Sequence, residues 1–132
     1  MRTIIELHFM GGPPFMFVLS SLFLIILILA TYSAILLLFR KNSKTTILKN
    51  TILGIIYLGV FALVWGFLGQ GIGIYQALWA IQQAADISPA IIMGGIRVSL
   101  ITPLYGMIIL LIASLIWYFL KVKYNTIITT ER

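Results

Sequence analysis

The sequence is dominated by three apolar runs that contain no charged residue. They cover residues 15–39, 50–85 and 98–120 of a chain of 132 residues. A helix needs about 20 consecutive apolar residues to cross the hydrocarbon core of a bilayer, so each run is long enough to span. Only 9% of the residues are charged and 61% are hydrophobic, which excludes a water-soluble domain of this size. The sequence therefore predicts an all-α membrane protein with three transmembrane helices.

The bounds of the predicted elements follow from the ends of these runs. In chain order they are a short outer interfacial segment (1–14), transmembrane helix 1 (15–39), a basic cytoplasmic loop (40–50), transmembrane helix 2 (51–85), an outer loop (86–88), transmembrane helix 3 (89–120) and a cytoplasmic tail (121–132). Ser88 is a suitable N-cap for the third helix, with Pro89 at its first position. A helix over 51–85 is much longer than the roughly 30 Å hydrocarbon core, so its polar end is expected to project outside.

Basic residues indicate the orientation. Seven of them flank the predicted cytoplasmic ends of the spans: Arg40, Lys41, Lys44, Lys49, Lys121, Lys123 and Arg132. The opposite side has only Arg2 and Arg97. Because Lys and Arg are enriched in cytoplasmic loops, the N-terminus is expected outside and the C-terminus inside. The net charge of +6 is thus explained by topology, without a nucleic-acid partner.

Small residues recur at helical spacing in the second and third predicted helices. The two stripes are Ala62, Gly66, Gly69, Gly73, Ala77, Ala80 and Ala84, and Gly95, Ser99, Thr102, Gly106 and Ala113. Such stripes allow close helix packing in membranes. These two helices could pack on each other, on neighbouring subunits or around a central element, and each glycine could serve packing alone. The first helix is bulky nearly all round, which suits a lipid-facing position. Since three helices are too few to enclose a pathway, we expect a ring of subunits.

Polar side chains at membrane depth are candidates for an ion path. Gln70 lies next to the glycine stripe of the second helix, and Ser99 and Thr102 lie on the stripe of the third. Such groups need partners or a wet cavity, although an ordinary interhelical hydrogen bond is the alternative for Gln70. Arg97, near the outer end of the third helix, could extend to the interface or contact an ion path or a partner.

The predicted spans contain no carboxylate, because Glu6, Asp86 and Glu131 all lie at or beyond their ends. A proton relay needs a titratable group near the middle of the membrane, so another chain would have to supply it. The chain has no cysteine, and His8 is its only histidine. We therefore expect no metal or other cofactor, and the lack of a nucleophile with its base or of paired carboxylates predicts no enzyme.

Two segments resemble the MotA/TolQ/ExbB proton-channel family. "GFLGQGIGIYQAL" at 66–78 is similar to its second membrane helix, a glycine-rich run followed by an amphipathic extension. "DISPAIIMGGIRVSLITPLYGMII" at 86–109 is similar to the outer loop and the start of its third helix. The resemblance covers roughly the last two-thirds of the chain. It implies a ring, with five copies expected, around a single-span ExbD/TolR/MotB-like partner that carries the membrane aspartate.

The sequence departs from this family at several positions. Gln70 and Pro103 stand where the family has threonines, Val98 replaces an acidic residue, and an eleven-residue loop replaces a cytoplasmic helical domain. A proline inside a helix frees a carbonyl, which could take over from the lost hydroxyl. The resemblance therefore implies a path lined by Gln70, Ser99, Thr102 and Pro103.

The resulting hypothesis is a channel subunit of a proton-driven motor in the bacterial inner membrane. In it, helices approach closely at the five glycines of the stripes: Gly66, Gly69, Gly73, Gly95 and Gly106. The alternative is a non-conducting structural ring with the same fold, which holds lipid or a partner helix. The departures at Gln70 and Pro103 keep this alternative open.

Overall fold

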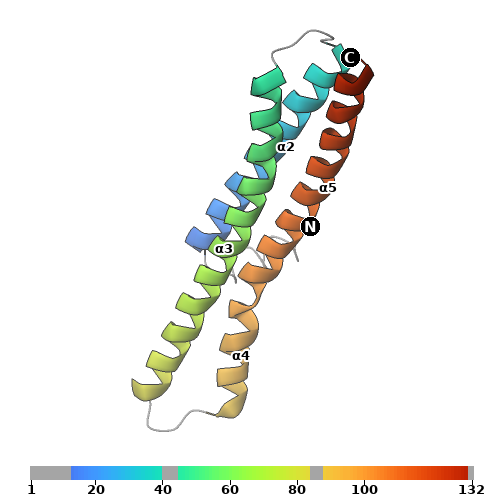
Figure 1. Cartoon of the computed structure of the whole chain (residues 1–132). Helices are drawn as coiled ribbons and strands as arrows, with labels where there is room; N and C mark the ends of the chain where they lie inside the picture. Colours follow the sequence, from blue (N-terminus) through green and yellow to red (C-terminus); the bar gives the residue numbers. More distant parts are fainter. Residues whose placement is uncertain (1–12, 40–44, 84–87, 131–132) are drawn as a thin grey trace, which may run out of the picture.

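The described part of the chain is entirely helical. The computed structural model describes residues 13–39, 45–83 and 88–130 and contains four helices there: α2 (Pro13–Phe39), α3 (Thr45–Gln83), α4 (Pro89–Ser99) and α5 (Ile101–Thr130) (Figure 1). Residues 1–12 of the predicted interfacial segment lie outside these ranges, as do residues 40–44 and 86–87 of the two predicted loops. Three helical stretches, Phe15–Leu38, Thr46–Gln83 and Pro89–Ile127, are long and apolar enough to cross a membrane.

Helix α2 has one buried face despite its uniformly apolar sequence. Met16, Leu19, Ile26 and Ser33 are buried at spacings of three and seven residues, which lie on one side of a helix. The opposite side, including Ile28, is exposed. The first helix is therefore exposed on one side only, and its other side packs on α3 and α5.

The third predicted span is divided into two helices. Helix α4 ends at Ser99 and α5 begins at Ile101, with Leu100 as the C-cap residue between them. The sequence predicted one helix over 89–120. Pro103 lies in the first turn of α5 and has no N–H, so it cannot donate to the carbonyl oxygen of Ser99. On either side of this gap the backbone bonds from Leu100 to Ile96 (3.2 Å) and from Leu104 to Leu100 (3.3 Å) are present.

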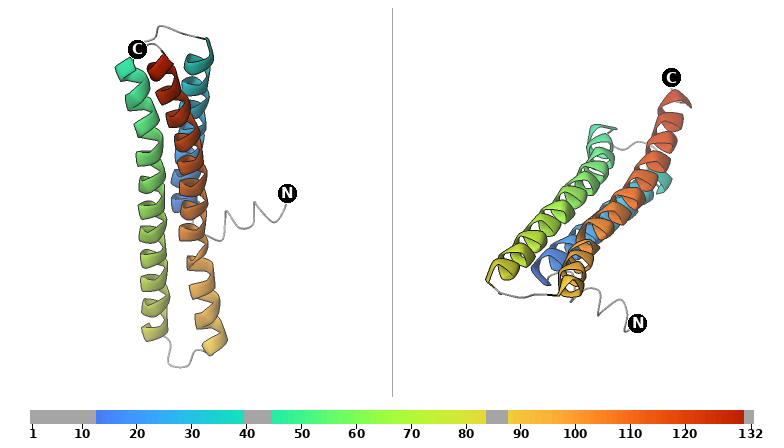
Figure 2. Two further views of the ribbon diagram at one scale, coloured as in Figure 1. Left: turned by 45° about the vertical axis from the view of Figure 1, so that its right-hand side comes forward. Right: turned by 90° about the horizontal axis from the view of Figure 1, so that it is seen from below.

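The helices form a bundle that continues into a narrower arm. Helices α2, α3 and α5 lie side by side, and α2 starts about halfway along α3 (Figures 1 and 2). Beyond the start of α2, α3 continues alongside α4. We call residues 70–83 and 89–99 the arm. With 39 residues, α3 is about 58 Å long, so it exceeds the roughly 30 Å hydrocarbon core of a membrane.

Candidate functional site

The two small-residue stripes pack against each other within one chain. A Cβ atom added at Gly66 would lie 2.8 Å from the carbonyl oxygen of Thr102, and one added at Gly106 would lie 2.8 Å from the carbonyl oxygen of Ala62. Each helix thus places its backbone directly on a glycine of the other. A side chain at either position would collide with main-chain atoms, which cannot rotate away. We call this close contact of α3 with α5 the seam.

The seam extends in both directions from this central contact. Toward the start of α3, a Cβ atom at Gly59 would lie 2.8 Å from the Cβ atom of Ala113. Gly59 was missed by the sequence analysis, although it continues the stripe three residues before Ala62. Toward the arm, a Cβ atom added at Gly69 would lie 3.3 Å from the Cγ2 atom of Thr102, and one added at Gly73 would lie 3.0 Å from the Cβ atom of Ser99.

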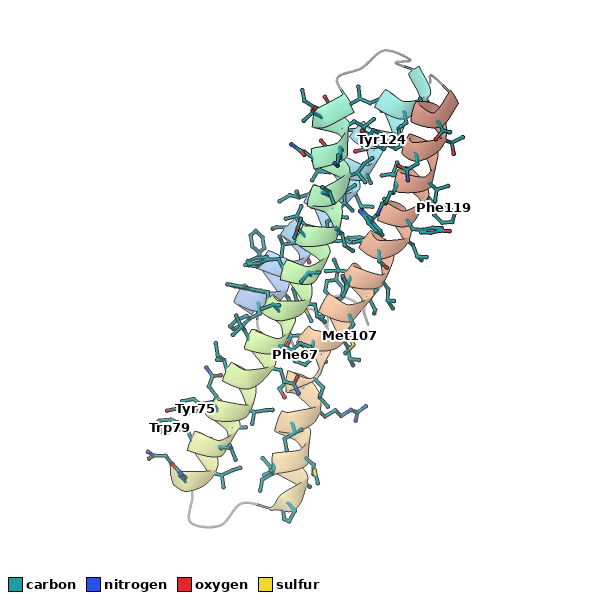
Figure 3. All side chains as sticks on the ribbon, in the orientation of Figure 1. Phe67, Tyr75, Trp79, Met107, Phe119 and Tyr124 are labelled. Carbon is teal, nitrogen blue, oxygen red and sulfur yellow. The ribbon has the colours of Figure 1, made fainter. Side chains whose placement is uncertain are left out.

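The far end of the arm is packed less tightly. A Cβ atom at Gly95 would meet the Cβ atom of Ala77 at 3.5 Å, an ordinary van der Waals distance, and a Cβ atom at Gly94 would meet nothing within 4 Å among the described residues. Tyr75 and Trp79 are exposed, and Figure 3 shows them on the side of α3 that faces away from α4. The arm therefore has large apolar side chains on its surface.

Three of the four predicted path residues lie inside the chain rather than on its surface. The exposed fraction is 1% for Thr102 and 7% for Ser99, and Pro103 is fully buried. All three lie at the junction of α4 with α5 and pack against α3, where Gly66, Gly69 and Gly73 provide the space. Only Gln70, on α3, is partly exposed, and its side chain makes no hydrogen bond within the described ranges.

The hydroxyl groups near the junction donate to backbone carbonyl groups one turn earlier in the chain. The Thr102 Oγ1 atom donates a hydrogen bond of 3.0 Å to the carbonyl oxygen of Ser99, and the Ser99 Oγ atom donates one of 2.8 Å to the carbonyl oxygen of Ile96. In a regular helix the Ser99 carbonyl would accept from the N–H of residue 103, which is a proline here. Thr102 therefore supplies a donor where Pro103 cannot.

The remaining candidate, Arg97, is exposed in the last turn of α4. A cation is favourable there because the last carbonyl groups of a helix carry partial negative charge. The described residues include no Asp or Glu, so no carboxylate among them pairs with Arg97. They also form no group of His, Cys, Asp and Glu suited to a metal ion.

Comparison with known proteins gives one family. The family model described as MotA/TolQ/ExbB proton channel family matches residues 40–131, which is well over half of the chain and includes all of α3, α4 and α5. No curated protein and no solved structure matches the chain. The matched range holds both sides of the seam and every candidate path residue.

Proposed function

The chain belongs to the MotA/TolQ/ExbB proton channel family, and from this premise we propose that it is a ring-forming channel subunit of a proton-driven motor. The family match carries the proposal. In this proposal several copies, five by resemblance to the family, surround the membrane helix of a single-span ExbD/TolR/MotB-like partner. The complex lies in the bacterial inner membrane, and ion flow through it drives work by the partner.

The charge distribution supports the orientation within this proposal. Lys49, Lys121 and Lys123 lie at the end of the bundle opposite the arm, whereas the arm carries Arg97. By the enrichment of basic residues on the cytoplasmic side, the bundle end with the three lysines faces the cytoplasm. The arm then projects on the outer side, where the partner would perform its work.

The packing supports different roles for the predicted path residues. Gln70 is the one whose side chain is partly exposed, so it would contact the path directly. Ser99, Thr102 and Pro103 are buried, so they would shape the wall behind it. Because the described spans contain no carboxylate, the proton-binding acid would come from the partner.

The first test is native mass spectrometry of the complex, extracted gently from its own membrane, with each co-purifying chain sequenced. We expect a ring together with a smaller single-span protein that has an aspartate in its span. Proton flux is then measured in vesicles that contain the complex. Gln70→Ala should lower the flux, whereas Gln76→Ala, a matched change at an exposed position of the arm, should not. Equal flux in both variants and the unmodified complex would contradict the role of Gln70.

A second candidate function is a non-conducting structural ring that holds lipid or a partner helix. The observation that favours it is the junction of α4 with α5, where the hydroxyls of Ser99 and Thr102 are buried and bonded to nearby backbone carbonyl groups. Because both side chains are buried against α3, neither faces a passage in which it could replace the hydration of a moving ion. A ring that contains only this chain and lipid, and that carries no proton flux when neighbouring genes are co-expressed, would favour this function.

A further inference from the structure

Three lysines lie at similar heights near the end of the bundle away from the arm. Lys49 on α3 and Lys121 and Lys123 on α5 are all exposed. Gly59 of α3 lies against Ala113 of α5. From this contact, Lys49 is ten residues back along α3 and Lys123 is ten residues forward along α5. Because the two helices are antiparallel and each rises about 1.5 Å per residue, both lysines reach the same height. We call the three lysines the basic end.

The basic end has no counter-charge among the described residues. These contain no Asp or Glu, and the three acidic residues of the chain, Glu6, Asp86 and Glu131, all lie outside the described ranges. The sequence adds Arg40, Lys41 and Lys44 between the end of α2 and the start of α3. The described bundle therefore leaves its positive charge for an anion from elsewhere.

An apolar surface adjoins the lysines on α5. The Nζ atom of Lys121 lies 4.3 Å from the centre of the Trp117 ring, a cation–π contact that holds the ammonium group next to the bundle. Tyr118, Phe119 and Val122 are exposed on the same part of α5, and Figure 3 shows Phe119 directed away from α3. Residues three and four positions apart are neighbours on a helix surface, so Tyr118 adjoins Lys121 and Phe119 adjoins Lys123.

This combination of charge and apolar surface selects one class of ligand. We propose that the basic end binds the headgroup of an anionic phospholipid, with its acyl chains along Tyr118, Phe119 and Val122. Lysines just outside a membrane span attract acidic headgroups, and aromatic residues are favoured at that depth. An acidic soluble protein would engage the lysines but would leave the adjoining apolar surface uncovered. The inference goes beyond the proposed function and needs only that the helices span a membrane, so it holds for a conducting or a non-conducting ring.

The test uses Trp117 as a reporter of the lipid beside it. The chain has three tryptophans, so replacing Trp65 and Trp79 by phenylalanine leaves Trp117 alone. The full chain is reconstituted in vesicles of phosphatidylcholine and phosphatidylglycerol in which one or the other lipid carries bromine, a fluorescence quencher. Stronger quenching by brominated phosphatidylglycerol is expected, with a preference of about fivefold for each lysine that contacts the headgroup. The preference should fall at high salt.

Two variants and a control identify the residues responsible. Lys49→Gln should reduce the preference although Lys49 is on another helix from Trp117, so any direct effect of the substitution on the reporter is avoided. Lys121→Gln combined with Lys123→Gln should reduce it further. Arg97→Gln removes one positive charge from the arm and should leave it unchanged. Equal quenching by both brominated lipids, or a preference that the lysine variants do not change, would overturn the proposal.

A second measurement does not depend on the tryptophan substitutions. Native mass spectrometry of the unmodified chain in an equal mixture of the two lipids should show several times more phosphatidylglycerol than phosphatidylcholine bound. Equal occupancy would again overturn the inference. The lipid result and the proton-flux result are independent, so failure of one leaves the other to be decided by its own experiment.

Discussion

The seam within the bundle and the arm beyond it are made by the same long helix, yet they are packed in different ways. At the seam, Gly66 and Gly106 receive the backbone of the opposing helix, and α2 covers a further side, where the rings of Phe15 and Trp65 lie 6.0 Å apart. In the arm, α3 packs on the shorter α4, and Gly95 has room for a Cβ atom at an ordinary distance of 3.5 Å from the Cβ atom of Ala77. The large apolar side chains of the arm are left exposed.

This difference separates residues that hold the subunit together from residues available for assembly. Close contact between helices is a main source of stability in a membrane, where burial of apolar surface away from lipid contributes little. The seam makes such contacts within the chain. The exposed apolar side chains of the arm gain little from the described fold, so in the proposed complex they would be covered by neighbouring subunits or by the partner.

Adding one methyl group to each region should produce the largest contrast. Gly106→Ala would place a Cβ atom 2.8 Å from the Ala62 carbonyl oxygen and 3.1 Å from the Leu63 Cα atom. Because both are backbone atoms, the helices must separate, and we expect a loss of about 1–3 kcal/mol in the free energy of unfolding. Reversible unfolding in mixed micelles measures it. Gly95→Ala, whose Cβ atom would meet the Ala77 Cβ atom at an ordinary 3.5 Å across the arm, is the matched control and should be neutral or slightly stabilising. Equal losses would remove the distinction between seam and arm.

Gly59 tests whether the seam continues to the basic end. Gly59→Ala would bring two methyl groups to 2.8 Å, since its nearest neighbour would be the Ala113 Cβ atom. Leu110 also approaches this position, but through the end of a side chain that can move, so we expect a smaller loss of about 1–2 kcal/mol. Exchanging the two residues, with Gly59→Ala and Ala113→Gly together, should recover most of the stability, as a double-mutant cycle would show. If the losses of the two single variants simply add in the double variant, the strain does not arise from the contact between Gly59 and Ala113.

The arm should show the opposite behaviour. Tyr75 and Trp79 are exposed on α3, so replacing both by alanine should change the unfolding free energy of the subunit very little. If the arm takes part in assembly, the same variant should shift the complex from rings toward single chains in native mass spectrometry. Phe119→Ala, at an exposed position of α5 in the bundle, is the control. A large loss of subunit stability with unchanged rings would contradict the division between the two regions.

The spans and the seam follow from strong physical constraints on sequence. A run without charge is required wherever a helix crosses lipid, and small residues are required wherever two backbones meet, so both leave a visible pattern. The pattern did not reveal which face of α2 is buried. Leu19 and Ile28 are equally apolar, yet the first is buried and the second exposed. In a helix without polar residues on one side, packing with the neighbours decides the orientation.

The candidate site was harder to predict because a hydroxyl group can donate its hydrogen bond to a backbone carbonyl one turn away. Thr102 and Ser99 lie on the small-residue stripe and were interpreted as path residues because polar groups are costly at membrane depth. Both hydroxyls bond to carbonyl groups of their own turn, which removes that cost and allows them to be buried. Gln70 has a longer side chain with more hydrogen-bonding groups, and it remains partly exposed. The third span is divided at Leu100, close to Pro103. The presence of a proline in the sequence does not predict such a division, because membrane helices often tolerate proline.

The junction of arm and bundle allows the finest test, since it concerns a single hydrogen bond. Thr102→Val keeps the shape of the side chain but removes the donor to the Ser99 carbonyl. We expect a loss of about 0.6 kcal/mol and at most about 1.7 kcal/mol, the average and the maximum found for side-chain hydrogen bonds between membrane helices. In a Pro103→Ala background the N–H of residue 103 can donate to that carbonyl, so the same change should cost much less. Thr31→Val is the control, because the Thr31 hydroxyl bonds to the Leu27 carbonyl, which also has a regular helical donor four residues on. A cost for Thr102→Val that is the same with and without the proline would mean that Thr102 does not compensate for Pro103.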